Sequence, residues 1–172
     1  MKLKWWQALL GALSGLAIWE TVAQAKETRE RREKYAAALD YARSVGKPLL
    51  VTGGPWGPWA RFVGVPAGHG FGDVCIDINP AACRNGAAVK VADVRRIPYP
   101  TKHFGAVLAS HVLEHLGSIG DAKAAIRELH RVADRVFIAG PRKTSLMAQL
   151  HPGHHLWVSE MANGDILLEQ RG

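Results

Sequence analysis

Small and polar residues directly follow four short apolar runs of the sequence, and their types and spacing suggest chemistry. Glycines let a ligand approach backbone amides closely, and an acid at the end of a strand can accept hydrogen bonds from both hydroxyls of a ribose. A further acid can accept a hydrogen bond from an exocyclic amine. The pattern predicts a site for a nucleoside-bearing ligand, made in chain order by Gly53, Gly54, Gly57, Asp77, Asp93, Ser110 and His111.

The apolar runs themselves predict the elements that position these residues. Strands are expected at 48–52, 73–78, 88–92, 104–109, 135–139 and 165–169, with a helix from Ser118 or Asp121 to about residue 133. Because these strands are apolar without alternation, they indicate a mostly parallel sheet covered on both faces. Ligands bind such a sheet at the carboxyl ends of its strands, where the glycines and acids stand.

Four stretches of the sequence resemble a known family, the class I S-adenosylmethionine-dependent methyltransferases, and within it the small type-11-like group. They are residues 77–80 (DINP), 92–100 (ADVRRIPYP) leading to Phe104, 110–116 (SHVLEHL) and 128–132 (ELHRV). The resemblance covers roughly residues 47–141. It implies a three-layer Rossmann-like α/β fold with a mostly parallel sheet, S-adenosylmethionine as cofactor and methyl transfer as the reaction.

The same resemblance implies roles for single residues. Asp77 is expected to hold the ribose of the cofactor, while Asp93 and Val94 flank its adenine. Ser110 and His111 are expected beside the cofactor, near the mouth for the substrate.

The sequence also departs from the family pattern. Val51 stands where the family has an acid, the alternating glycines that follow read Gly53, Pro55 and Gly57, and Gly105 replaces a common acid before the fourth strand. Few residues follow the last predicted strand, so little cap over the substrate is expected. These departures keep open a second interpretation, a membrane-tethered pseudo-methyltransferase that serves as an interaction module.

Histidine is the candidate general base for a hydroxyl acceptor, because the cofactor of this family carries an already activated methyl group. His111 is the first choice, and His154 and His155, after the fifth strand, are alternates. The stretch 151–155 (HPGHH) can also hold a metal ion, but its Pro-Gly turn favours a solvated loop, so no metal is expected. The acceptor is expected to be a small molecule, a glycan or a lipid.

Other classes of function have weaker support. Residues 111–115 (HVLEH) formally match a zinc-peptidase motif, but that motif needs one continuous helix and here it directly follows a strand. The formal net charge is +7 without a basic stripe interleaved with aromatic residues, so nucleic acid is not expected as a partner. Cys75 and Cys83 are too few for a disulfide scaffold and are expected as reduced thiols.

The head of the chain differs from the rest. Residues 5–22 carry no charge before Glu20 and have tryptophans near both ends, as in a membrane span. At about 1.5 Å per residue this segment is about 27 Å long, close to the roughly 30 Å of a bilayer core. A signal peptide cleaved after Ala25 and a helix lying on a membrane or on the domain remain alternatives.

The sequence therefore divides into a membrane anchor or signal peptide at 1–25, a connecting helix at 26–46 and a methyltransferase-like domain at 47–172. The pairs Glu27/Arg31 and Glu30/Lys34 predict that the connecting helix faces solvent. More Lys and Arg residues follow the apolar segment than precede it, so the domain is expected to face the cytoplasm, where the cofactor is made. The oligomeric state is not indicated.

Overall fold

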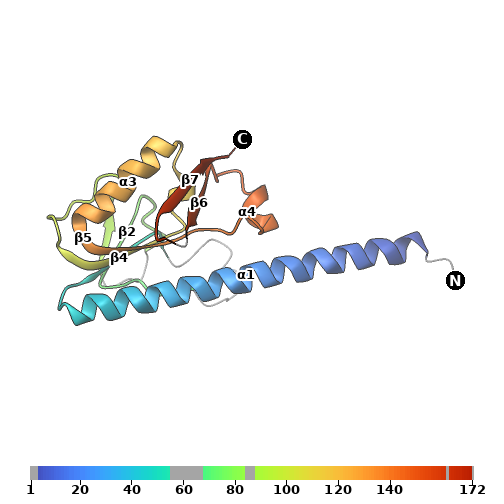
Figure 1. Ribbon diagram of the computed structural model, residues 1–172, viewed down its shortest axis with the longest axis horizontal. Coiled ribbons are helices and arrows are strands. Elements are labelled where there is room, and N and C mark those ends of the chain that lie inside the picture. The colour runs from blue at the N-terminus through green and yellow to red at the C-terminus, as the bar shows by residue number, and fades with distance from the viewer. Residues whose placement is uncertain (1–3, 55–67, 84–87, 162, 172) are drawn as a thin grey trace.

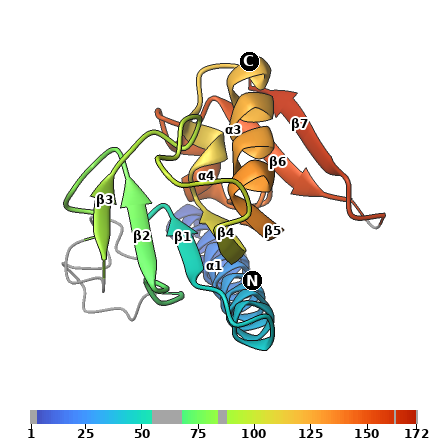
Figure 2. The same cartoon turned by 90° about the vertical axis from the view of Figure 1, so that its left-hand side faces the viewer.

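Five parallel strands form the sheet that organises the fold. In the computed structural model, which describes residues 4–54, 68–83, 88–161 and 163–171, they are β1 (Leu49–Thr52), β2 (Val74–Asp77), β3 (Val89–Val91), β4 (Phe104–Ser110) and β5 (Ala133–Ala139). Their order is β3-β2-β1-β4-β5 (Figure 2). The order reverses between β1 and β4, which is the point where doubly wound sheets bind ligands. The predicted α/β fold with a mostly parallel sheet is confirmed.

Helices cover both faces of this sheet, which gives three layers. Helix α1 (Trp5–Ser44) lies along one face and helix α3 (Ile119–Val132) along the other (Figures 1 and 2). On the first face, Ala38 and Ala42 of α1 pack against Leu49, Val51 and Leu108. A larger core on the second face joins the sheet to α3, with Leu50, Phe104, Val107, Leu129 and Val132 among its members.

Helix α3 follows from its sequence. The Ser118 hydroxyl accepts a hydrogen bond from the Asp121 backbone N–H at 3.0 Å, which caps the first turn as expected. Glu128 and Arg131 then bind the segment before β4: a Glu128 carboxylate oxygen accepts from the Ile97 N–H, and Arg131 donates to the carbonyls of Ile97 and Tyr99. Two of the stretches that carry the family resemblance thus hold each other in place.

Helix α1 is one uninterrupted helix, although the sequence divided it near residue 25. Its C-terminal half is not a solvent-facing connector, because Glu27, Ala38 and Ala42 are buried on the sheet. Its N-terminal part projects past the sheet with exposed apolar side chains (Figure 1). Among the described residues it alone is long and apolar enough to cross a membrane, a test that signal sequences and core helices also pass.

The C-terminal region contains elements that the sequence did not reveal. Helix α4 (Leu146–Leu150) and strand β6 (Leu156–Glu160) follow β5, and β6 pairs antiparallel with β7 (Ile166–Gln170). The predicted last strand therefore exists, but it lies in a separate two-stranded sheet rather than in the parallel one. Val158, Ile166 and Leu168 pack into the core on the α3 side, so burial of these side chains, rather than pairing with the parallel sheet, attaches the hairpin to the domain.

The expectation of two reduced thiols is wrong in this structure. Cys75, in β2, and Cys83, in the turn after it, form a disulfide with their Cα atoms 5.7 Å apart. Both residues are fully buried. The turn beyond β2 brings Cys83 back beside the strand, a proximity that residue counting does not reveal.

Candidate functional site

Predicted site residues lie together at the carboxyl ends of β1, β2 and β4: Gly53 and Gly54 after β1, Asp77 at the end of β2 and Ser110 at the end of β4. Gly53 has φ +79°, and a Cβ added there would lie 2.1 Å from the carbonyl oxygen of Ser110. A Cβ on Gly54 would lie 1.9 Å from the carbonyl oxygen of Ala82. Only glycine fits either position, because backbone crowds both. The third glycine of the prediction, Gly57, lies outside the described residues.

Asp77 is the last residue of β2 and lies at the same edge of the sheet. One carboxylate oxygen accepts from the Asn79 N–H at 2.7 Å and the other from the Gly54 N–H at 3.3 Å. Within the part of the chain that the structure describes, each oxygen keeps a further lone pair, and the residue is half-buried, so the carboxylate is fixed and can still accept from a diol. Beside it, the buried Thr52 hydroxyl has no hydrogen-bond partner among the described residues. These groups fit the polar ribose half of a nucleoside cofactor.

Asp93 and Val94 fit the adenine half less well. The Asp93 carboxylate forms an ion pair with Arg95 at 2.6 Å, and Arg95 also reaches Asp121 at 2.7 Å. Hydrogen bonds from Arg95 hold the pKa of Asp93 below its usual range. Val94 is a core residue packed on the α3 side. An adenine amine can reach Asp93 only if Arg95 gives way.

Ser110 and His111 stand where β4 leaves the sheet. Ser110 is fully buried, and its hydroxyl accepts from the Arg31 guanidinium at 3.2 Å. His111 has φ +54°, a conformation that non-glycine residues rarely adopt. Such strain is maintained only where the surroundings hold the residue, and it concentrates at functional sites.

His111 lies between two carboxylates. Its Nε2 is 3.0 Å from Glu27 of α1, and its Nδ1 is 3.4 Å from Glu114 of the short 3₁₀ helix η1 (Leu113–His115). Both acids are buried, whereas the His111 side chain keeps 25% of its surface exposed. His111 and His115 do not share a continuous helix, as the zinc-peptidase motif would require.

Glu27 remains ionised despite its burial. Burial raises the pKa of this carboxyl, but contacts with His111, the Arg142 N–H and the Arg31 charge outweigh it and hold the pKa below its usual value. Sequence reasoning missed Glu27 because it was paired with Arg31 on a solvent-facing helix. The available signal was the helical spacing of Glu27 and Arg31 with Ala38 and Ala42, which places them on one face.

Another histidine, His69, lies near Arg31 and His111. His69 is buried and stacks on Tyr35 of α1, with ring centroids 6.0 Å apart. Its Nδ1 donates to the Gly70 carbonyl at 2.8 Å. Burial first, and then the nearby Arg31 and His111, lower the pKa of His69 to about 4, so the ring is neutral near pH 7.

The two alternate candidate bases, His154 and His155, lie in different surroundings. The His154 ring lies against His115 and His151, and burial together with these rings lowers its pKa to about 4. The His155 side chain is exposed, and its backbone N–H donates to the Glu114 carbonyl at 2.7 Å. His111 is therefore the one predicted base placed at the end of β4 beside the glycine edge.

A cavity of about 370 Å³ lies next to this edge, beyond β5. Its lining includes Glu30 and Lys34 of α1, Arg142 and Lys143 before α4, and Glu160 of β6. None of the predicted cofactor residues that the structure describes lines it. The cavity thus offers charged groups of both signs on the side away from β2 and β3.

Residues 67–135 match the family model of a methyltransferase domain, which spans β2 to the start of β5. No curated protein matches.

Three solved structures are given as examples of those similar to this chain. They are a sarcosine dimethylglycine methyltransferase described as putative, from Galdieria sulphuraria (20% identity, 59% of this chain and 41% of that one, TM-score 0.40), the trans-methyltransferase CalH with SAH (21%, 68% and 39%, 0.43) and the SAM-bound amino pentose methyltransferase CalS10 from Micromonospora echinaspora (20%, 77% and 55%, 0.38). The chain spans about two fifths to just over half of their length. The family match and the strand order confirm the resemblance to the class I S-adenosylmethionine-dependent methyltransferases.

Proposed function

We propose that this protein is an S-adenosylmethionine-dependent methyltransferase that acts on a small-molecule, glycan or lipid acceptor at the cytoplasmic face of a membrane. The observation that carries the proposal is the meeting of Gly53, Asp77 and Ser110 at one sheet edge, within a domain whose sequence matches the methyltransferase model. The order of the strands places this edge at the switch point.

The residues divide the work of binding and alignment. The cofactor, when bound, supplies a methyl group on a sulfonium that needs no further activation. Asp77 accepts the hydrogen bonds of the ribose hydroxyls, and the crowded backbone of Gly53 and Gly54 sets the distance of the ligand from β1. The protein then has to align the acceptor and take its proton.

His111 is the residue in a position to take that proton. Its strained backbone presents the ring at the end of β4, where Nε2 lies 3.0 Å from the Glu27 carboxylate. Nδ1 lies 3.4 Å from Glu114 and has to turn from it to the acceptor to take the proton. A carboxylate on one ring nitrogen orients the ring and stabilises the positive charge that the ring acquires with a proton. Glu27 does not touch the cofactor edge itself, so it is a positioning residue.

One observation supports the alternative interpretation as a pseudo-methyltransferase. Arg95 occupies the carboxylate of Asp93, the residue expected to meet the adenine. An interaction module needs no cofactor, so the two interpretations differ in whether the chain binds S-adenosylmethionine at all.

Calorimetry of the full-length protein in detergent, titrated with S-adenosylmethionine and with S-adenosylhomocysteine, separates them. Asp77→Asn should weaken binding by about 10- to 100-fold, because each charge-assisted hydrogen bond contributes about 1.5–3 kcal/mol. Asp165→Asn, in the β6–β7 turn, is the matched control and should bind as the wild type does. A wild-type protein that binds neither ligand at millimolar concentration is the pseudo-enzyme.

The membrane part of the proposal rests on how α1 meets α4. The Trp19 indole N–H donates to the Thr144 carbonyl at 2.8 Å, and Glu20 accepts from the Ser145 hydroxyl and the Leu146 N–H. The domain therefore reaches up α1 as far as Trp19. The free part, Trp5–Ile18, is about 21 Å long at about 1.5 Å per residue, shorter than the roughly 30 Å of a bilayer core, so with the domain docked it enters the membrane without crossing the whole core.

Helix α4 supplies a second apolar contact at the same level. Met147 and Leu150 of α4 are 59% and 79% exposed. Helix α4 itself lies beside the part of α1 where that helix leaves the domain (Figure 1). We expect them to enter the interface together with Trp19. The charged cavity beyond β5 includes Lys143 and Thr144, which lead into α4, so an acceptor headgroup at the surface has a short path to it.

Flotation of the full-length protein with phospholipid vesicles tests this attachment. The double variant Met147→Ser with Leu150→Ser should float less, whereas Met161→Ser, equally apolar and exposed at the far hairpin, should not change flotation. Mass spectrometry of the N-terminus of the protein from cells completes the test. A soluble product that begins at Lys26 would overturn the anchor.

A further inference from the structure

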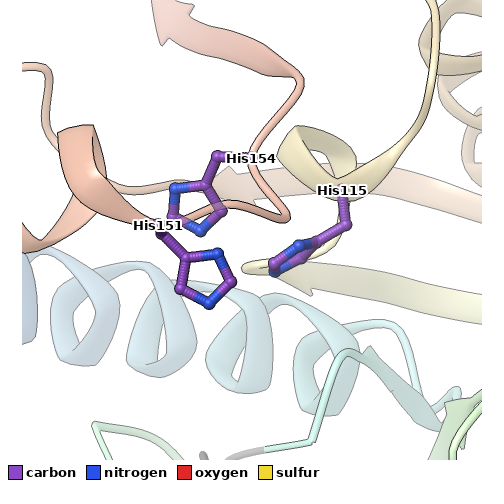
Figure 3. A group of neighbouring side chains, drawn as sticks. All are labelled: His115, His151 and His154. Atoms are coloured by element: carbon purple, nitrogen blue, oxygen red, sulfur yellow. The ribbon is translucent and has the colours of Figure 1, made fainter.

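Three histidines from two separate segments meet beside the proposed site (Figure 3). His115 ends η1, while His151 and His154 belong to the turn between α4 and β6. The ring centroids of His151 and His154 are 4.2 Å apart, and those of His115 lie 5.5 Å and 4.9 Å from them. One nitrogen from each ring lies within 4.8 Å of the other two.

Backbone groups fix the orientation of two of these rings. His115 Nδ1 is 2.8 Å from the Gly153 carbonyl, and His154 Nδ1 is 3.1 Å from the Ala148 carbonyl. A carbonyl oxygen only accepts, so both Nδ1 atoms carry the proton and the lone pair of each neutral ring is on Nε2. Histidine ligands of metals are commonly held by this kind of hydrogen bond on their other nitrogen.

His151 is the adaptable member of the group. Its Nδ1 accepts a hydrogen bond from the Gly153 N–H at 3.1 Å, and the side chain is exposed. As a third ligand it binds through Nδ1 after giving up that hydrogen bond, or through Nε2 after its proton moves to Nδ1, which also ends the hydrogen bond. Two ligands are therefore oriented in advance and the third adjusts.

The turn that carries His151 and His154 is itself held in place. The Arg171 guanidinium donates to the carbonyls of both histidines at 3.0 Å and 3.2 Å, and it lies over the Trp157 ring. On the other side, the His155 N–H donates to the Glu114 carbonyl, which ties the turn to η1. The two ligand-bearing segments are thus joined even without the histidine rings.

We propose that His115, His151 and His154 form a binding site for a divalent late transition-metal ion such as zinc. Three imidazoles without a carboxylate or thiolate suit zinc, copper or nickel and do not suit calcium or magnesium. The ligand atoms need to approach from 4.8 Å to about 3.3 Å, the separation across a tetrahedral zinc with bonds of about 2.0–2.1 Å. Small rotations of the exposed His115 and His151 side chains towards the half-buried His154 ring cover that difference.

The site has a consequence for the neighbouring chemistry, although its existence does not depend on the proposed function. Zinc bound there joins the turn before β6 to η1, which directly follows Ser110 and His111. It fixes the segment that borders the end of β4 and leaves a fourth coordination position for water or another ligand.

Metal titration of the full-length protein, made without a histidine tag and stripped with a chelator, tests the proposal. Wild-type protein should bind one zinc ion at micromolar concentration, and cobalt bound at the same site should show the visible absorption of a low-coordinate ion. His115→Gln, His151→Gln and His154→Gln should each weaken binding by at least about 10- to 100-fold. His155→Gln and His103→Gln, at exposed histidines outside the group, should bind as the wild type does.

Near-ultraviolet circular dichroism shows whether each variant keeps the packing of its tryptophans, so a loss of binding is not confused with misfolding. A wild-type protein that binds no zinc overturns the proposal. Binding that survives in the triple variant, or that disappears in His155→Gln, overturns it as well.

Discussion

Nε2 of His111 lies 3.0 Å from the carboxylate of Glu27, and this contact makes the N-terminal helix part of the candidate site. Arg31, one turn further along α1, donates to Ser110 at the end of the same strand. Helix α1 therefore covers the edge where the sequence predicted little cap. The segment interpreted as a connector supplies both a partner for the candidate base and one layer of the fold.

Replacing Glu27 with Gln tests that contact. The variant loses the charge that faces His111 and accepts from the Arg142 N–H, so we expect a loss of about 1–3 kcal/mol in the free energy of unfolding, measured by urea denaturation at pH 7. Glu33→Gln, which breaks an exposed pair with Arg29, should cost less than about 1 kcal/mol. If His111 takes the proton of the acceptor, Glu27→Gln should also lower kcat with little change in KM.

The effect of Glu27→Gln on the free energy of unfolding should depend on pH. The pKa of Glu27 is lower in the folded chain than the ordinary value of 4.5, so its contribution is complete above about that pH and is lost as the pH falls through the folded pKa. The stability difference between wild type and Glu27→Gln should therefore shrink below pH 4.5. A difference that stays constant down to the acid transition would contradict the ionised pair.

Gly105 shows why one departure from the family pattern is needed. A Cβ there would lie 2.8 Å from Val45 and 2.9 Å from the Cα of Ala42, so an acid at this position collides with α1. We expect Gly105→Ala to cost about 1–3 kcal/mol of stability through overpacking. Gly120→Ala, in the open first turn of α3, should instead stabilise by about 0.4–1 kcal/mol, and thermal unfolding compares the two.

Sequence reasoning reached the parallel sheet because β1, β4 and β5 are continuous apolar runs, whose burial is visible in residue type alone. It also placed Gly53, Asp77 and Ser110 at one edge of the sheet, because strand ends converge in any parallel sheet; their role as cofactor residues stays a prediction. It missed α4 and β6, which are short and whose apolar residues do not repeat at a clear helical or strand spacing. It missed Glu27 because a local helix pair explained that residue without reference to a distant strand.

His69 predicts a pH dependence of stability. Its pKa is about 4 in the folded chain against the ordinary histidine value of 6.5, so the unfolded chain binds the extra proton between these values and stability falls as the pH falls from 6.5 towards 4. The part due to His69 amounts to about 2 kcal/mol between pH 7 and pH 5. Urea denaturation should show a smaller loss in His69→Gln and an unchanged loss in His103→Gln, whose ring is exposed.

The Cys75–Cys83 disulfide predicts a redox dependence of stability. Closing so short a loop stabilises by about 2–3 kcal/mol in the chain-entropy description. Oxidised wild type should therefore unfold at higher denaturant than reduced wild type, and Cys83→Ala should respond to neither condition. Equal midpoints with and without reductant would contradict the pairing.

The disulfide also bears on the compartment, because such bonds persist outside the cytoplasm and are rare within it. Alkylation of the thiols in intact cells, followed by mass spectrometry, measures the fraction of Cys75 that is paired. The cytoplasmic orientation predicts alkylated thiols in the cell and a disulfide only after oxidation. A fully paired Cys75 in fresh cells would place the domain on the other side of the membrane.

Hydrogen–deuterium exchange of the full-length protein, with and without S-adenosylhomocysteine, tests the central claim most directly. A cofactor at the predicted edge should slow exchange in the peptides that contain Gly53, Asp77 and His111, and leave the β6–β7 hairpin unchanged. Protection confined to the cavity beyond β5, or no protection at saturating ligand, would contradict a methyltransferase site at the carboxyl ends of β1, β2 and β4.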